Sequence, residues 1–124
     1  MRRFAPCATL GRQIQYWKKP KTMALLEFSI TPLGAGESVS PYVARAVELV
    51  DASGLDYRLH AMGTVVEGDV GPLLDLLRKC IEAVAADCDR VSVTAKIDYR
   101  KNHSGSLAAK VASVEKRLGR AVKK

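Results

Sequence analysis

The fold can be worked out from residues 24–31, which read Ala-Leu-Leu-Glu-Phe-Ser-Ile-Thr. Leu26, Phe28 and Ile30 alternate with polar residues, and this period of two is typical of a strand that buries only one of its faces. Pro32 and the glycines that follow it end the pattern. The regular part of the chain therefore opens with a strand whose apolar side other elements must cover.

Two amphipathic segments can supply that cover. The first begins at Ser40, the expected N-cap, with Pro41 in the first helical position and Gly54 as the expected stop. The second follows Asp69, which can cap it, and has Pro72 in its first turn. Apolar residues recur at helical spacing in both segments: Val43, Ala46, Val47 and Val50 in the first, and Leu73, Leu77, Cys80, Ile81 and Val84 in the second.

Three further strands and a last helix are predicted. Residues 56–62 and 64–69 form a hairpin, because Gly63 between them allows a tight reversal. Residues 90–98 alternate in the same way as residues 24–31. After a break, apolar residues recur every three or four positions in a terminal helix: Leu107, Val111, Val114 and Leu118. Because two helices already cover the sheet, we expect this last stripe to pack between subunits.

The order of elements is strand–helix–strand–strand–helix–strand, with an added C-terminal helix. This is the α+β, ferredoxin-like split βαβ (βαββαβ) arrangement, in which both helices cover one face of the sheet. The opposite face is predicted to be polar and rich in small hydroxyls, carrying Glu27, Ser29, Thr31, Glu67, Ser92, Thr94, Lys96 and Asp98. Such a face is either wet or closes over a partner subunit and leaves room for a polar ligand.

The net charge of +7 is distributed unevenly. The basic excess lies in residues 1–22 and 99–124, whereas residues 23–98 hold six basic and twelve acidic residues. A basic end is more often a solvated tail or an address than a nucleic-acid site. We therefore expect a disordered tail over residues 1–22 and one domain over residues 23–124. The tail is either an organelle-targeting presequence or an over-long start ahead of Met23, and without targeting we expect a cytoplasmic protein.

The sequence contains no strong catalytic or metal-binding motif, and we expect no cofactor. Cys7, Cys80 and Cys88 show no pair at zinc spacing, and an odd number of cysteines does not suit a disulfide framework. His60 and His103 have no neighbouring His or Cys at metal spacing. No apolar run approaches the roughly 20 residues that cross a bilayer. We therefore expect neither an enzyme nor an integral membrane protein.

Four segments, taken together and in order, resemble the small thiamine-binding protein family, the YkoF-like superfamily. They are Glu27-Phe-Ser-Ile-Thr-Pro-Leu-Gly34, Ser38-Val-Ser-Pro-Tyr-Val-Ala44, Met62-Gly-Thr-Val-Val-Glu-Gly68 and Arg90-Val-Ser-Val-Thr-Ala-Lys-Ile-Asp-Tyr-Arg100. The resemblance covers about residues 23–120. It implies a ferredoxin-like fold whose dimers associate through their sheets and pair into tetramers. It also implies binding of thiamine or its hydroxymethylpyrimidine part, with no established catalysis.

The chemistry of such a ligand predicts a site on the polar face. A carboxylate can accept from the amino group of an aminopyrimidine, hydroxyls can donate to its ring nitrogens, and an acid or an aromatic ring favours the thiazolium charge. We expect Glu67 to be the principal acceptor and Glu27 its competitor. The other candidates are Ser29, Thr31, Thr94 and Thr64 for their hydroxyls, and Tyr42 as an aromatic wall. If neither carboxylate acts, the site is expected beside Ser38, Ser40 and Tyr42.

Two other functions stay open on the sequence alone. Split βαβ folds often bind RNA, but the last predicted strand has one Tyr and no aromatic pair. The expected partners are therefore a small molecule and further copies of this chain, rather than nucleic acid. The third possibility is a small enzyme acting on a thiamine degradation product, for which no nucleophile or base can be named.

Overall fold

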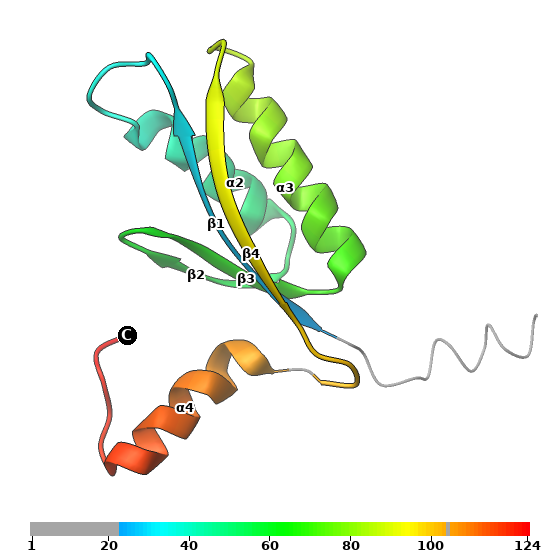
Figure 1. The fold of residues 1–124 in the computed structure, drawn as a ribbon, viewed down its shortest axis with the longest axis vertical. Coiled ribbons are helices and arrows are strands. Elements are labelled where there is room, and N and C mark those ends of the chain that lie inside the picture. Colours follow the sequence, from blue (N-terminus) through cyan, green and yellow to red (C-terminus); the bar gives the residue numbers. More distant parts are fainter. Residues whose placement is uncertain (1–22, 104) are drawn as a thin grey trace, which may run out of the picture.

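The computed structural model describes residues 23–103 and 105–124, and the expectations for residues 1–22 lie outside this part. Four strands form one antiparallel sheet in the order β2-β3-β1-β4, and two helices pack on one of its faces (Figure 1). The strands are β1 (Ala24–Pro32), β2 (Asp56–His60), β3 (Gly63–Gly68) and β4 (Val91–Tyr99); the helices are α2 (Ser40–Ala52), α3 (Val70–Ala85) and α4 (Ser106–Leu118). This confirms the predicted ferredoxin-like order with an added C-terminal helix.

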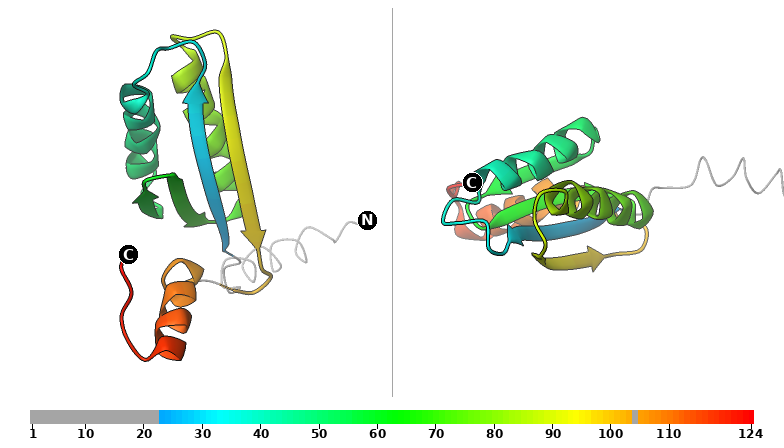
Figure 2. Two further views of the ribbon diagram at one scale, coloured as in Figure 1. Left: turned by 60° about the vertical axis from the view of Figure 1, so that its left-hand side comes forward. Right: turned by 90° about the horizontal axis from the view of Figure 1, so that it is seen from above.

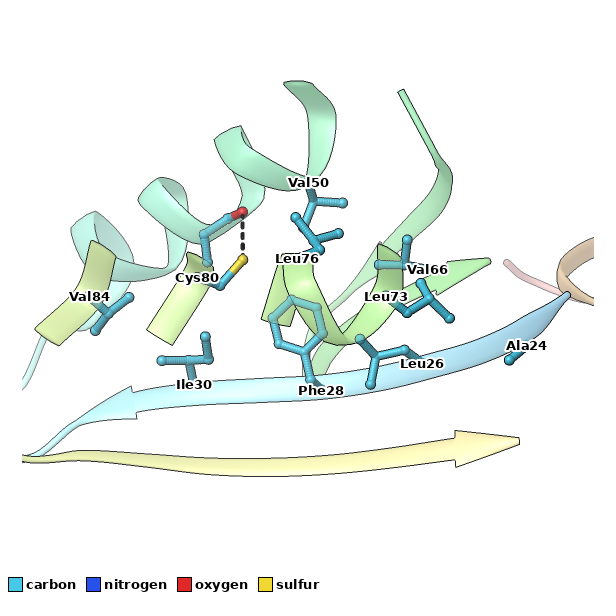
Figure 3. Packing of buried hydrophobic residues seen from close by; sticks show 11 residues of the cluster. Ala24, Leu26, Phe28, Ile30, Val50, Val66, Leu73, Leu76, Cys80 and Val84 are labelled. Atoms are coloured by element: carbon cyan, nitrogen blue, oxygen red, sulfur yellow. Dashed lines mark hydrogen bonds between the residues drawn. The ribbon is translucent and has the colours of Figure 1, made fainter. Parts of the chain in front are cut away.

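The hydrophobic core fills the space between β1 and the two covering helices (Figure 3). Full burial of one Val, Leu, Ile or Phe side chain contributes about 1.5–3 kcal/mol to the stability of the fold. One part of the predicted α3 face is wrong: Leu77 and Ile81 are only half-buried, whereas Leu76 is buried. The buried cluster consists of Ala24, Leu26, Phe28, Ile30, Ala46, Val50, Val66, Leu73, Leu76, Cys80 and Val84.

Helix α2 begins with a cap that differs from the predicted one. Its N-cap is Val39, so Ser40 is already helical and makes no capping hydrogen bond, and Pro41 comes second. The Tyr42 backbone N–H donates to the Val39 carbonyl at 3.0 Å. Proline is tolerated in this first turn because the N–H it lacks has no partner within the helix. At the other end, Gly54 follows the helix with φ +76°, which confirms the predicted stop.

The hairpin glycine has a different role from the predicted one. Ala61 and Met62 form the two-residue turn, and His60 pairs with Gly63 across it. Gly63 therefore belongs to β3 and is not the turn residue. A Cβ atom at Gly63 would lie 2.9 Å from the backbone oxygen of Phe28. The close approach of β3 to β1, rather than turn geometry, thus requires glycine here.

Helix α4 extends past the end of the sheet and covers neither of its faces (Figures 1 and 2). Its contacts with the rest of the domain are chiefly with β1 and β3. None of the helices within residues 23–103 and 105–124 is both long enough and apolar enough to span a bilayer.

We predict that Gly63→Ala lowers the free energy of unfolding by about 1–3 kcal/mol, because the added methyl group must push β3 away from β1. Gly71→Ala is the matched control, since nothing lies within 4 Å of a Cβ atom at that position in α3. The control should be neutral or stabilising by up to about 1 kcal/mol. Urea unfolding of the two variants checks this. Equal unfolding midpoints would show that the close contact between β3 and β1 does not exclude a side chain at residue 63.

Candidate ligand-binding site

One face of the sheet, which we call the open face, is turned away from α2 and α3 (Figure 2). The strand register decides which side chains it carries. Glu27 of β1 lies opposite Val65 of β3 and Lys96 of β4, and Leu25 lies opposite Glu67 and Asp98. The alternation along each strand then gives the full set: Leu25, Glu27, Ser29, Thr31, Asp56, Arg58, His60, Gly63, Val65, Glu67, Ser92, Thr94, Lys96 and Asp98. The placement of all eight predicted polar residues on this face is confirmed.

Small hydroxyl side chains gather where β1 and β4 run side by side on the open face. Ser29 lies opposite Thr94, and Thr31 lies opposite Ser92. The exposed carboxylate of Glu27 is the next open-face group along β1. Within the described part of the chain, none of these five side chains has a hydrogen-bond or ion-pair partner. Their donors and acceptors are therefore available to a ligand.

Glu67 is engaged in a different interaction. Its side chain is only 6% exposed, and its Oε2 atom accepts a hydrogen bond of 2.8 Å from the backbone N–H of Ser106. Ser106 is the first residue of α4, so the carboxylate satisfies a donor that has no partner within the helix. A negative charge at a helix N-terminus is also favoured by the helix dipole. Glu67 thus anchors α4, and its expected role as the principal ligand acceptor stays a prediction; Glu27 is the more accessible of the two carboxylates.

Two of the predicted site residues lie on the other side of the sheet. Thr64 is buried and pairs in register with Phe28, whose side chain faces the core. Tyr42 lies on α2 and packs against the core, with the Arg45 guanidinium 5.1 Å from its ring centroid. Thr64 and Glu67 are three positions apart on one strand, and such residues face opposite ways. The open face therefore gathers five of the seven candidates and leaves out these two.

The C-terminal end of β4 is tied to α4 by an ion pair between Asp98 and Lys110. The hydrogen bond from the Lys110 ammonium holds the pKa of the Asp98 carboxyl below its usual range. Both side chains are about half exposed, so the pair contributes little to stability. It does hold α4 near the C-terminal end of β4. The open face is thus bounded by α4 near residues 67 and 98 and unobstructed near the hydroxyl groups.

A groove of about 800 Å³ lies between α2 and β2, away from the open face. Val43, Val47 and Leu59 are among its apolar lining residues. The Tyr57 hydroxyl, which also lines it, donates a 3.1 Å hydrogen bond to Asp51, and this bond raises the pKa of Tyr57. Ser40, which belongs to the alternative site predicted from the sequence, also lines this groove. No pattern in the sequence indicates the groove itself, because it depends on the distance between a helix and an edge strand.

The described residues assemble no metal site, and the buried Cys80 is part of the core. No group of three or more His, Cys, Asp or Glu side chains within residues 23–103 and 105–124 could hold a metal ion. Burial raises the pKa of the Cys80 thiol to about 11, so this sulfur stays protonated at neutral pH. Its Sγ–H donates weakly to the Ala46 carbonyl at 3.6 Å between the helices (Figure 3). This environment suits a small core residue better than a nucleophile.

Comparison with known proteins finds relatives over most of the described part. The profile of the thiamine-binding protein family matches residues 26–115. The UPF0045 protein of Mycobacterium tuberculosis is 42% identical over 95 residues, which is 76% of this chain and 93% of the relative. The UPF0045 protein MJ1052 of Methanocaldococcus jannaschii is 40% identical over 88 residues, covering 71% of this chain and 88% of the relative.

Solved structures show the same fold. The structure of MJ1052 matches with a TM-score of 0.70 at 38% identity, covering 74% of this chain and 95% of that one. A Thermotoga maritima protein proposed to act in thiamine biosynthesis or salvage matches with a TM-score of 0.66. Its identity is 18%, with coverage of 74% of this chain and 98% of that one, so this likeness shows the fold alone.

We predict that Glu67→Gln loosens α4 without unfolding the sheet. Hydrogen bonds to charged groups contribute about 1.5–3 kcal/mol, and the neutral amide retains part of this. We expect the free energy of unfolding to fall by about 1 kcal/mol and the amide of Ser106 to exchange faster with solvent. Glu27→Gln is the control, because Glu27 is exposed and has no partner among the described residues. Unchanged protection at Ser106 in Glu67→Gln would show that the carboxylate does not anchor the helix.

Proposed function

The chain belongs to the thiamine-binding protein family, and from this premise we propose that it binds thiamine or its hydroxymethylpyrimidine part on the open face. The observation that carries the proposal is the set of unpartnered polar groups at Glu27, Ser29, Thr31 and Thr94. These four residues lie within the stretch that matches the family profile. The proposed role is binding without chemical change of the ligand.

Glu27 is the proposed principal acceptor. An aminopyrimidine offers an amino donor and ring nitrogens that accept hydrogen bonds. The Glu27 carboxylate suits the amino group, and the neighbouring hydroxyls of Ser29 and Thr94 suit the ring nitrogens. A carboxylate also complements the permanent positive charge of the thiazolium ring. Lys96 lies directly across from Glu27, and its ammonium would favour a phosphorylated form of the ligand.

We propose further that a second copy of the chain completes the site. A ligand lying on a single sheet face would keep one side in water, whereas ligand sites usually bury most of the ligand surface. The open face also carries Leu25 and Val65 among its polar groups, which suits contact with another protein layer. Sheet-to-sheet association into a dimer or tetramer would enclose the ligand between two such faces. A cytoplasmic location belongs to the same proposal, because the free Cys80 and Cys88 fit a reducing compartment.

We predict that Glu27→Gln weakens thiamine binding by about ten-fold or more in calorimetry of the full chain. Loss of a hydrogen bond to a charged acceptor costs about 1.5–3 kcal/mol, and 1.4 kcal/mol corresponds to a factor of ten. Glu82→Gln is the matched control, because Glu82 lies on α3 and pairs with Arg78 at 2.9 Å. The control should bind as the parent protein does.

Equal affinities of the Glu27→Gln variant and the parent protein would remove Glu27 from the site. The ligands to be compared are thiamine, its phosphate esters and hydroxymethylpyrimidine, since Lys96 distinguishes phosphorylated from unphosphorylated forms. The absence of heat with all of them at millimolar concentration would overturn the proposed function.

A further inference from the structure

We propose that the groove between α2 and β2 receives helix α4 of a second copy of this chain. This interface is separate from the open face and does not rest on the proposed ligand. It pairs two surfaces that the described structure leaves exposed: an apolar stripe on a basic helix and an apolar groove with acidic residues along it.

The exposed stripe lies on the far half of α4. Val114 and Leu118 are 51% and 50% exposed, which is unusual for the apolar side of an amphipathic helix. Lys116 and Arg117 stand in the last turn of the same helix. Neither cation has an ion-pair partner among the described residues. The helix therefore offers an apolar surface with free positive charge beside it.

The groove has the matching character. Val43, Val47 and Leu59 form apolar wall, and Glu48 and Asp51 of α2 also line it. Leu59 is 56% exposed, and Met62 in the adjoining hairpin turn is 89% exposed. Glu48 has no ion-pair partner within residues 23–103 and 105–124. An amphipathic helix laid into an apolar groove is a recurrent mode of recognition, and here the charges at the two surfaces are opposite.

The position of α4 indicates that the groove it fills is on another molecule. Its first turn is held by Glu67 through the Ser106 N–H, and Lys110 pairs with Asp98 of β4. From these two anchors the helix runs away from its own sheet, so that its last turns stand clear of the domain (Figures 1 and 2). An open groove of this kind also suits a helix better than a small molecule, which needs enclosing walls. Two copies can exchange α4 reciprocally about a two-fold axis.

Charge exchange between two variants tests the interface. The first variant, Ala44→Lys with Glu48→Lys, makes the groove basic at two exposed positions of α2. The second, Lys116→Glu with Arg117→Glu, makes the last turn of α4 acidic. Each variant alone should show a lower mass than the parent in sedimentation equilibrium, because like charges then meet at both contacts of a dimer. An equimolar mixture should regain the parental mass, because each groove then meets a helix of opposite charge.

Three controls make the result decisive. Glu82→Lys adds positive charge on α3 outside the groove and should keep the parental mass, and circular dichroism should show that all variants remain folded. A parent protein that is monomeric, a variant that keeps the parental mass, or a mixture that does not regain it would each overturn the inference. Thiamine calorimetry on the same variants separates the two proposals, since neither pair of substitutions lies on the open face. A variant with a lower mass that still binds thiamine with the heat of the parent protein supports this interface. Absence of binding heat in the parent protein would contradict the proposed function alone.

Discussion

The alternation of side chains along β1 is the constraint on which the rest of the structure depends. The even-numbered residues Leu26, Phe28 and Ile30 form the centre of the core, and β1 lies between β3 and β4 in the sheet. A slip of one residue would turn Glu27 into the core and Phe28 to the open face, at the cost of a buried charge and a lost aromatic contact. The same alternation that drives folding therefore also fixes Glu27 and its neighbouring hydroxyls on the uncovered side.

The contact of the buried Glu67 carboxylate with α4 bears on why that side of the sheet stays uncovered. It accepts a hydrogen bond from the Ser106 N–H and so holds the first residue of α4 at the end of the sheet, from which the helix runs away from the sheet (Figure 1). The helix therefore leaves the open face uncovered and presents its own apolar stripe to the surroundings. One interaction thus links a strand of the sheet, the exposure of the candidate ligand face and the exposure of a second surface suited to association.

Much of the fold and part of the site could be predicted because local patterns report them directly. Strand alternation gave the open face correctly, since a period of two leaves no choice of side once the core face is known. The role of Gly63 could not be read in the same way, because the clash that excludes a side chain there involves Phe28 on another strand. The anchoring role of Glu67 depends on Ser106, which is 39 residues away. The position of Thr64 on the core side, in contrast, could be predicted from the sequence. Thr64 and Glu67 are three positions apart on one strand, and such residues face opposite ways.

The place where thiamine binds can be found from the chemical shifts of methyl groups, measured by nuclear magnetic resonance of the full chain as thiamine is added. Thr31, Thr94 and Val65 report the open face, whereas Val43, Val47 and Leu59 report the groove between α2 and β2. Saturating thiamine is expected to shift the methyl signals of the first group and to leave those of the second unchanged. Shifts confined to the groove, or no shift in either group at millimolar thiamine, would contradict this expectation.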